Sequence, residues 1–408
     1  MLRSMAFAVA ALLAAAPALA QETIKIGVLG PMAFIQGEHH WAGAELARDD
    51  INAAGGIRVG GKQRKIELVR VDTNEIQSPP DATNAIERAI TRDKVDFLVG
   101  GFRSEAVLAM QEIAMDYKKL FLGCGAADAR LGQNVAKDYG RYKYWFRVTP
   151  LDSPGLGKSL FAILGDIGGQ IRRDLKKETP KVAILAEKVI WTEAIVKAAQ
   201  ANLPRMKMEV VGVWQPSATA TDVTAELAAI ERAGADIIFT VLSGPVGISV
   251  GRQMGERQMR AVAFGINVEA QKDGFWPATA SKGNYVSTLD TYGEVEMTPK
   301  MVPFVKAFKA RYHRMPTYTA GTYDALHMIQ EVVEKANTLD PDKLVPVIEQ
   351  TRFVGTGAYL EYDKSHEPVW GIGKDTGIGV QWQDGQKVPF WPPGVKGMKP
   401  YRFPTPAS

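Results

Sequence analysis

Ser104 occupies a position where a serine could do three kinds of chemistry. It follows the apolar run and two glycines of DFLVGG at 96–101 and leads into a helical pattern. A nucleophile needs a neighbouring base or a strained elbow, and neither accompanies this serine. The side chain could instead cap the helix, or its hydroxyl and the free N–H groups of the first turn could bind a carboxylate. The residues favour the cap, although a cap and an anion site use the same donors.

Two other patterns could indicate an enzyme, and both have a simpler explanation. The segment GISVG at 247–251 matches the G-x-S-x-G elbow of hydrolases, but the preceding strand ends too early and Ser249 falls about one turn inside a helix. Cys124 could form a thiol–imidazole pair with His39 or His40 from another strand-end loop. A lone cysteine is more often a small buried hydrophobe. We therefore expect no catalytic residues.

Signatures of cofactors and metals are weak in this chain. The triplet Gly157-Lys158-Ser159 resembles the end of a phosphate-binding loop, but the position that should hold its first glycine is Asp152. The five histidines offer one close pair, and adjacent side chains on regular structure point apart. The sequence predicts neither a cofactor nor a metal site.

Short β-branched runs separated by helical stretches must position the candidate residues. Each run is typical of a buried strand, and the alternation predicts β-α units around a parallel sheet. The pattern restarts after residue 180, so we expect two lobes of similar plan, then helices after Thr291 and an irregular or short-stranded segment from Gly371. The expected strands are 25–30, 65–72, 95–101 and 120–126 in the first lobe, and 181–188, 208–214, 235–242, 261–266 and 284–290 in the second.

The first 20 residues predict export from the cytoplasm. A basic start, an apolar stretch and Ala18-Leu19-Ala20 before Gln21 form the pattern of a cleaved signal peptide. Cys124 is the single cysteine, so none follows the cleavage site to carry a lipid. The 49 basic and 45 acidic residues show no basic cluster, which gives no support for nucleic-acid binding. We expect a soluble, monomeric periplasmic protein that is not a lipoprotein.

The chain resembles the periplasmic solute-binding proteins of the branched-chain amino acid and amide class, which serve ABC transporters. The resemblance implies an α/β fold in which two doubly wound parallel-sheet lobes, joined by a three-strand hinge, close over one small molecule. It covers nearly the whole mature chain. The segments that carry it are IKIGVLGPM at 24–32, AGAELARDDINAAGGI at 42–57, VRVD at 69–72, FLVGGFRS at 97–104, FRVTPLD at 146–152 and TYDALHMI at 322–329.

The same resemblance implies where the chain passes between the lobes. The crossovers are expected near 147–152, 288–292 and 354–362, so each lobe is built from discontinuous segments. The implied domains are a signal peptide at 1–20, an N-terminal lobe at 21–149 plus 290–355, and a C-terminal lobe at 150–289 plus 356–408.

Ligand-binding roles are also implied for several residues. Ser104 corresponds to the family serine that binds the ligand carboxylate through its hydroxyl and N–H. Ala126 matches the position whose carbonyl meets the ligand ammonium. Trp191 stands where a tyrosine is usual, and Tyr318 matches an aromatic position that borders the side-chain pocket.

Three further positions depart from the family pattern. Asp128 stands where a threonine is usual, and Asn267 replaces the acidic residue that neutralises an α-ammonium, which argues against a standard α-amino acid. Asp128 and the nearby Glu269 could restore that charge from other directions. A buried carboxylate is unfavourable without a partner, so Asp128 must meet a cation, a donor or Arg103. Arg103 replaces a small residue and could bind a second acid group of the ligand.

These residues predict the solute-binding component of an ABC importer, without catalytic activity. It would capture a small carboxylate-bearing solute between closing lobes and present the closed form to a membrane permease. The expected solute is a branched-chain or related amino acid, or an aromatic or organic acid or amide. Trp191 and Tyr318 would suit a flat or apolar ligand body. The alternative is a sensor protein that presents the same ligand to a membrane receptor.

Overall fold

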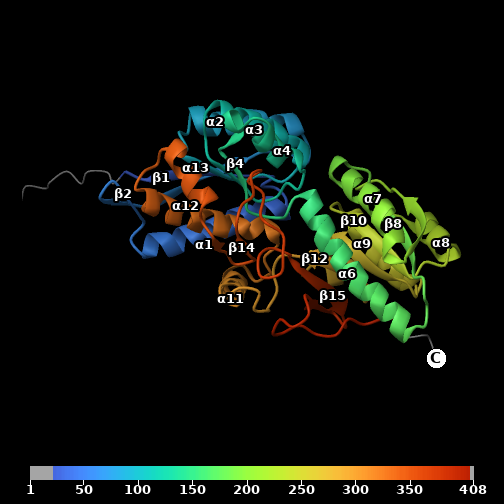
Figure 1. The fold of residues 1–408 in the computed structure, drawn as a ribbon. Coiled ribbons are helices and arrows are strands. Elements are labelled where there is room, and N and C mark those ends of the chain that lie inside the picture. Colours follow the sequence, from blue (N-terminus) through green and yellow to red (C-terminus); the bar gives the residue numbers. More distant parts are fainter. Residues whose placement is uncertain (1–21, 405–408) are drawn as a thin grey trace, which may run out of the picture.

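The computed structural model describes residues 22–404, which form two α/β lobes side by side (Figure 1). The predicted signal peptide lies outside these residues. Between residues 22 and 404, no helix combines the length and the apolar character needed to cross a membrane.

The first lobe contains a five-stranded, entirely parallel sheet in the order β4-β1-β5-β6-β7. Strands β1, β5, β6 and β7 are almost fully buried because helices cover the sheet, as expected for parallel strands of continuous apolar sequence, whereas the edge strand β4 is partly exposed. The strands are β1 (Ile24–Gly30), β4 (Ile66–Asp72), β5 (Phe97–Gly100), β6 (Phe121–Gly123) and β7 (Trp145–Arg147), and the main helices are α1 (Ile35–Ala53), α2 (Pro79–Thr91), α3 (Ser104–Asp116) and α12 (Thr322–Ala336).

The second lobe repeats this plan with a four-stranded parallel sheet in the order β11-β10-β8-β9. Apolar cores fill the space on both faces of the sheet. The strands are β8 (Lys181–Ala186), β9 (Glu209–Trp214), β10 (Ile237–Leu242) and β11 (Val262–Asn267), and the helices are α6 (Ser153–Asp174), α7 (Ile190–Asn202), α8 (Thr224–Arg232) and α9 (Val246–Glu256). The predicted α/β fold with two doubly wound parallel-sheet lobes is confirmed.

An antiparallel sheet lies where the lobes meet, with β12 (Ser287–Asp290), β15 (Ile378–Gln383) and β16 (Gln386–Trp391) in that order (Figure 1). The segment from Gly371 was expected to be irregular or short-stranded, but β15 and β16 are regular strands of six residues each. They form a two-residue hairpin whose central residues, Asp384 and Gly385, have φ of 52° and 81°. Asp-Gly is a preferred pair for such a turn.

Smaller elements complete the described chain. They are β2 (Ile57–Val59), β3 (Lys62–Arg64), β13 (Phe353–Val354), β14 (Tyr359–Leu360), α4 (Arg130–Lys137), α5 (Tyr139–Tyr142), α10 (Phe275–Ala278), α11 (Met301–Tyr312) and α13 (Pro341–Glu349), together with the 3₁₀ helices η1 (Pro204–Met206), η2 (Glu269–Gln271) and η3 (Tyr318–Gly321).

Candidate functional site

A cavity of about 970 Å³, counting its open mouth, lies between the two lobes. The first lobe contributes residues 102–105 at the start of α3, and the second contributes Trp191, Ser243 and the end of β11. The segments 149–151 and 289–291, which connect the lobes, form its floor together with 375–377. The cavity is therefore bounded by both lobes and by the chain that joins them.

Ser104 lines this cavity as the first residue of α3. The interpretation of Ser104 as a helix cap is wrong, because Arg103 occupies the cap position and no side chain caps the helix. The Ser104 hydroxyl oxygen instead accepts the backbone N–H of Asp128 at 3.3 Å. Its own O–H, like the N–H groups of the first helical turn, is then available to a ligand.

Glu75 occupies part of the anion site at this helix start, and the sequence analysis missed it. Its buried carboxylate accepts the N–H groups of Phe102 at 3.1 Å and Arg103 at 2.6 Å, and the hydroxyl of Thr73 at 2.7 Å. Burial raises the pKa of Glu75 to about 7, against the lowering effect of these donors. Glu75 lies three residues after the end of β4, and this position near a strand end could have indicated a residue of the site.

Arg103 and Asp128 each form an ion pair with a near neighbour in the sequence. The Arg103 guanidinium lies 2.5 Å from Glu105, at the cavity wall. Asp128 has the cation it requires in Arg130, at 2.6 Å, and not in Arg103. Burial acts to raise the pKa of the Asp128 carboxyl, but the hydrogen bonds and charge of Arg130 hold it below its ordinary value.

The Ala126 carbonyl is not directed to a ligand in this structure. It accepts a hydrogen bond from the fully buried guanidinium of Arg147, which also donates to the Asp128 carbonyl at 2.9 Å. Glu367 pairs with the same guanidinium. Arg147 therefore fixes the loop that carries Ala126 and Asp128, and the neighbouring residues Gly125 and Ala127 line the cavity in their place.

The second lobe brings Trp191 to the cavity wall together with a buried acid that the sequence analysis missed. The Trp191 indole N–H lies 3.3 Å from both the Glu187 carboxylate and the Ser243 hydroxyl. Glu187 also accepts hydrogen bonds from the Ser243 hydroxyl and from the Gly244 N–H. Its position directly after the apolar strand β8 was a usable signal, because strand ends meet at the cleft.

Asn267 lies at the end of β11 but is fully buried and does not line the cavity. Its amide donates to the Gly247 carbonyl at 3.1 Å and accepts the Ala270 N–H at 3.3 Å, so it binds two backbone segments of its own lobe. Glu269 pairs with Lys272 at 2.7 Å. Neither Asn267 nor Glu269 lines the cavity, so neither takes the place of the acidic residue that would bind a ligand ammonium.

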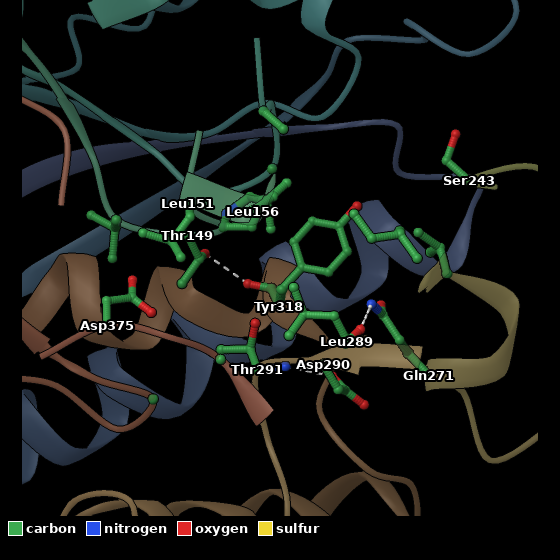
Figure 2. Close-up of a pocket in the computed structure, with 18 of the residues that line it drawn as sticks. Thr149, Leu151, Leu156, Ser243, Gln271, Leu289, Asp290, Thr291, Tyr318 and Asp375 are labelled. Carbon is green, nitrogen blue, oxygen red and sulfur yellow. Dashed lines mark hydrogen bonds between the residues drawn. The ribbon is translucent and has the colours of Figure 1, made fainter. Parts of the chain in front are cut away.

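Tyr318 projects its ring into the cavity, with Ser243 on one side and Asp375 on the other (Figure 2). The Thr149 hydroxyl donates to the Tyr318 carbonyl at 2.7 Å and holds this segment to the floor. The phenol hydroxyl forms no hydrogen bond with any described residue, and burial raises its pKa above the ordinary value. It is free to bond a ligand.

Among the described residues, the side chains considered for catalysis form no hydrogen bond with one another. Ser249 lies in the first turn of α9 and donates to the Ala220 carbonyl at 3.1 Å. His39 and His40 lie within α1, not in a loop, and burial lowers their pKa values to about 3 and about 4. His40 contacts the carbonyl of Cys124 at 3.1 Å, and the thiol donates to another carbonyl. Serine, imidazole and thiol therefore form no catalytic group here.

Two doubly wound lobes around a cavity bounded by both of them define a two-lobed solute-binding protein. The chain belongs to the periplasmic binding protein family, whose model matches residues 23–375. Solved structures that the chain resembles are described as substrate- or solute-binding proteins of transporters.

Relatives with known names or structures cover nearly the same length. A Leu/Ile/Val-binding protein homolog of Brucella abortus is 23% identical over 388 residues, 90% of each chain. The branched-chain amino acid transporter substrate binding protein of Streptococcus pneumoniae, solved with isoleucine, is 22% identical, covers 93% of this chain and 100% of its own, and has a TM-score of 0.74. A solute binding protein of R. palustris, solved with benzoate, is 20% identical over 92% and 99%, with a TM-score of 0.72.

Proposed function

We propose that this protein is the periplasmic solute-binding component of an ABC importer and that it captures a small solute bearing a carboxylate. The observation that carries the proposal is the position of Ser104, at the start of α3 and in the wall of the cavity between the lobes. Its hydroxyl and the first-turn N–H groups form an anion site, because the positive end of the helix dipole adds to their donors.

Closure of the lobes is the proposed transport signal. The cavity takes Ser104 from one lobe and Trp191 from the other, so a solute that touches both favours the closed form by its differential affinity. A membrane permease would then recognise that form. This coupling requires no chemistry on the solute.

The proposed solute is an acid with an apolar body. The named relatives were solved with isoleucine and with benzoate, and both ligands carry a carboxylate and an apolar group. Here the Ala126 carbonyl is bonded to Arg147 and Asn267 faces its own lobe, so the partners expected for an α-ammonium are not offered. Tyr318, Trp191 and several leucines supply apolar walls. These contacts favour aromatic and other organic acids over standard α-amino acids.

A thermal-shift screen tests the proposal. Branched-chain amino acids, benzoate and substituted benzoates, aliphatic acids and their amides would each be added to the purified mature protein. A solute that binds only the folded state raises the melting temperature in proportion to the logarithm of its concentration. We expect carboxylates to raise it and their neutral amides to have less effect. A screen in which the amides matched the acids would contradict a carboxylate site.

A further inference from the structure

The charged residues of the cavity are mostly acidic. Of the described residues that line it, Arg103 is cationic and Glu105, Asp290, Asp324 and Asp375 are anionic. Arg103 and Glu105 form an ion pair with each other at the mouth near α3. The three aspartates come from other segments of the wall: Asp290 and Asp375 from the floor, and Asp324 from the first turn of α12. A carboxylate there without a cationic partner favours positive charge.

Two of these three aspartates are already satisfied by the protein. Asp290 pairs with the buried ammonium of Lys387 at 2.8 Å and accepts the Thr291 N–H at 2.7 Å. Asp324 accepts both the N–H and the hydroxyl of Thr356, each at 2.8 Å. Hydrogen bonds and an ion pair within the protein therefore account for Asp290 and Asp324 in the cavity wall.

Asp375 has no comparable partner. Its side chain is 9% exposed, and no described lysine, arginine or histidine pairs with it. The backbone N–H of Gly377 is the one neighbour that favours its charged form, and burial raises its pKa to about 7. Figure 2 shows its carboxylate pointing toward the interior of the cavity, on the side of Thr149 and Thr291. A buried carboxylate without a partner is unfavourable, and a ligand cation would supply the missing one.

We propose that Asp375 forms a second polar subsite, which binds a basic nitrogen of the solute at the floor of the cavity. The solute is then a bipolar molecule, with a carboxylate at α3, an apolar body beside Tyr318 and an ammonium or amidinium group at Asp375. The inference rests on the proposed function and makes it more specific, because a simple carboxylic acid would leave Asp375 unpaired.

Matched probes test the subsite on the mature wild-type protein. Caproate would be compared with ε-aminocaproate, and para-methylbenzoate with para-(aminomethyl)benzoate, by thermal shift and calorimetry. The members of each pair differ in the terminal ammonium. We expect the amino compound of at least one pair to bind about tenfold or more tightly than its partner, as for a charged hydrogen bond formed in a buried site.

The variant Asp375→Asn assigns this preference to one residue. It should weaken binding of the preferred amino compound by about tenfold or more, and it should change the affinity for the matching acid without an amino group by less than about threefold. Asp384→Asn is the matched control, because Asp384 pairs with Arg402 on the surface and should alter neither affinity. The comparison of probes on the wild type does not depend on the folding of either variant.

The outcomes separate this inference from the proposed function. If the acids without an amino group bind the wild type as tightly as the amino compounds, or if Asp375→Asn keeps the preference, the subsite is wrong and the carboxylate site stands. The subsite is also wrong if all four probes fail while another acid of the screen binds. If no acid binds at all, both proposals are wrong.

Discussion

The Ser104 hydroxyl oxygen and the Asp128 backbone nitrogen lie 3.3 Å apart, joined by a hydrogen bond from the Asp128 N–H. The bond ties the start of α3 to the loop before α4, so two strand-end segments of the first lobe share one polar contact at the cavity wall. The contact does not use the hydroxyl proton of Ser104. An oxygen that accepts from the backbone keeps its own O–H for another acceptor, and the cavity is where a ligand would supply one.

Replacing Ser104 with alanine should weaken binding of a carboxylate solute by roughly 1–3 kcal/mol, because a charged ligand group loses a donor. Isothermal titration of the tightest acid from the screen would measure the loss. Ser249→Ala is the matched control, since that buried hydroxyl bonds only the Ala220 carbonyl and lies outside the cavity lining. Equal affinities in wild type and Ser104→Ala would leave the serine with only its contact to Asp128.

Removing the Tyr318 hydroxyl tests a donor that the protein itself leaves unused. Tyr318→Phe keeps the ring and breaks no hydrogen bond of the described residues, so the free energy of unfolding without ligand should change little. Affinity should fall about threefold to tenfold if the solute accepts from the phenol. Tyr401→Phe is the opposite control. Its hydroxyl lies 3.1 Å from that of Ser287, so the variant should lose about 1 kcal/mol of stability and no affinity.

The fold could be predicted from the sequence because its signals are local. Buried strands appear as short apolar runs, and the helices between them show their own period. Strands β15 and β16 were underestimated because glycines, prolines and tryptophans around them hide the alternation, although Asp384-Gly385 marks the turn. The Asp-Gly pair therefore indicated a hairpin, but the Gly, Pro and Trp-rich composition of the segment favoured an irregular structure.

The site could be predicted only in part, for a different physical reason. Ser104 and Trp191 lie in the first turns of the helices that follow β5 and β8, and strand ends meet at a cleft. Other candidate residues do not face the cavity because they bond groups that are distant in the sequence. The Arg147 guanidinium donates to the Ala126 carbonyl, and the Asn267 amide donates to the Gly247 carbonyl. No spacing of residues in the sequence predicts such a contact. Asp375 was missed because it lies in the segment treated as irregular.

The buried ion pair of Arg147 with Glu367 should dominate the stability of the Ala126–Asp128 loop. The guanidinium Nη2 lies 2.9 Å from the Glu367 carboxylate, with both side chains buried. Replacing Arg147 with methionine leaves the carboxylate without a partner and should cost about 3–5 kcal/mol of unfolding free energy, measured by urea denaturation.

The control for this prediction is a pair of the same chemistry on the surface. Arg257→Met breaks the ion pair with Glu231, whose partners are both about one-third exposed, and should cost under about 1 kcal/mol. Equal losses in the two variants would show that burial adds nothing to the Arg147 pair. A further result is expected from Arg147→Met alone: weaker solute binding, because the loop beside Ser104 loses its support.

Glu75 should make stability fall as the pH rises. Its folded pKa is about 7 and its ordinary value is 4.5, so between these values the folded state holds a proton that the unfolded state has lost. The stabilising contribution is therefore complete below about pH 4.5 and is lost as the pH rises through 7. Glu75→Gln removes the titration and keeps an acceptor for Phe102 and Arg103.

Urea denaturation at pH 5 and pH 8 measures this effect as a difference between variants, in which the other titrating groups cancel. Relative to the wild type, Glu75→Gln should gain roughly 2–3 kcal/mol between the two pH values, which is the part of the free energy of the pKa shift that is lost from pH 5 to pH 8. Glu361→Gln is the control, because hydrogen bonds from Lys374 lower the pKa of Glu361 and its carboxylate is ionised at both pH values. Its difference from the wild type should be the same at each. A Glu75→Gln difference that did not grow with pH would mean that the Glu75 carboxylate is already ionised in the folded protein at pH 5.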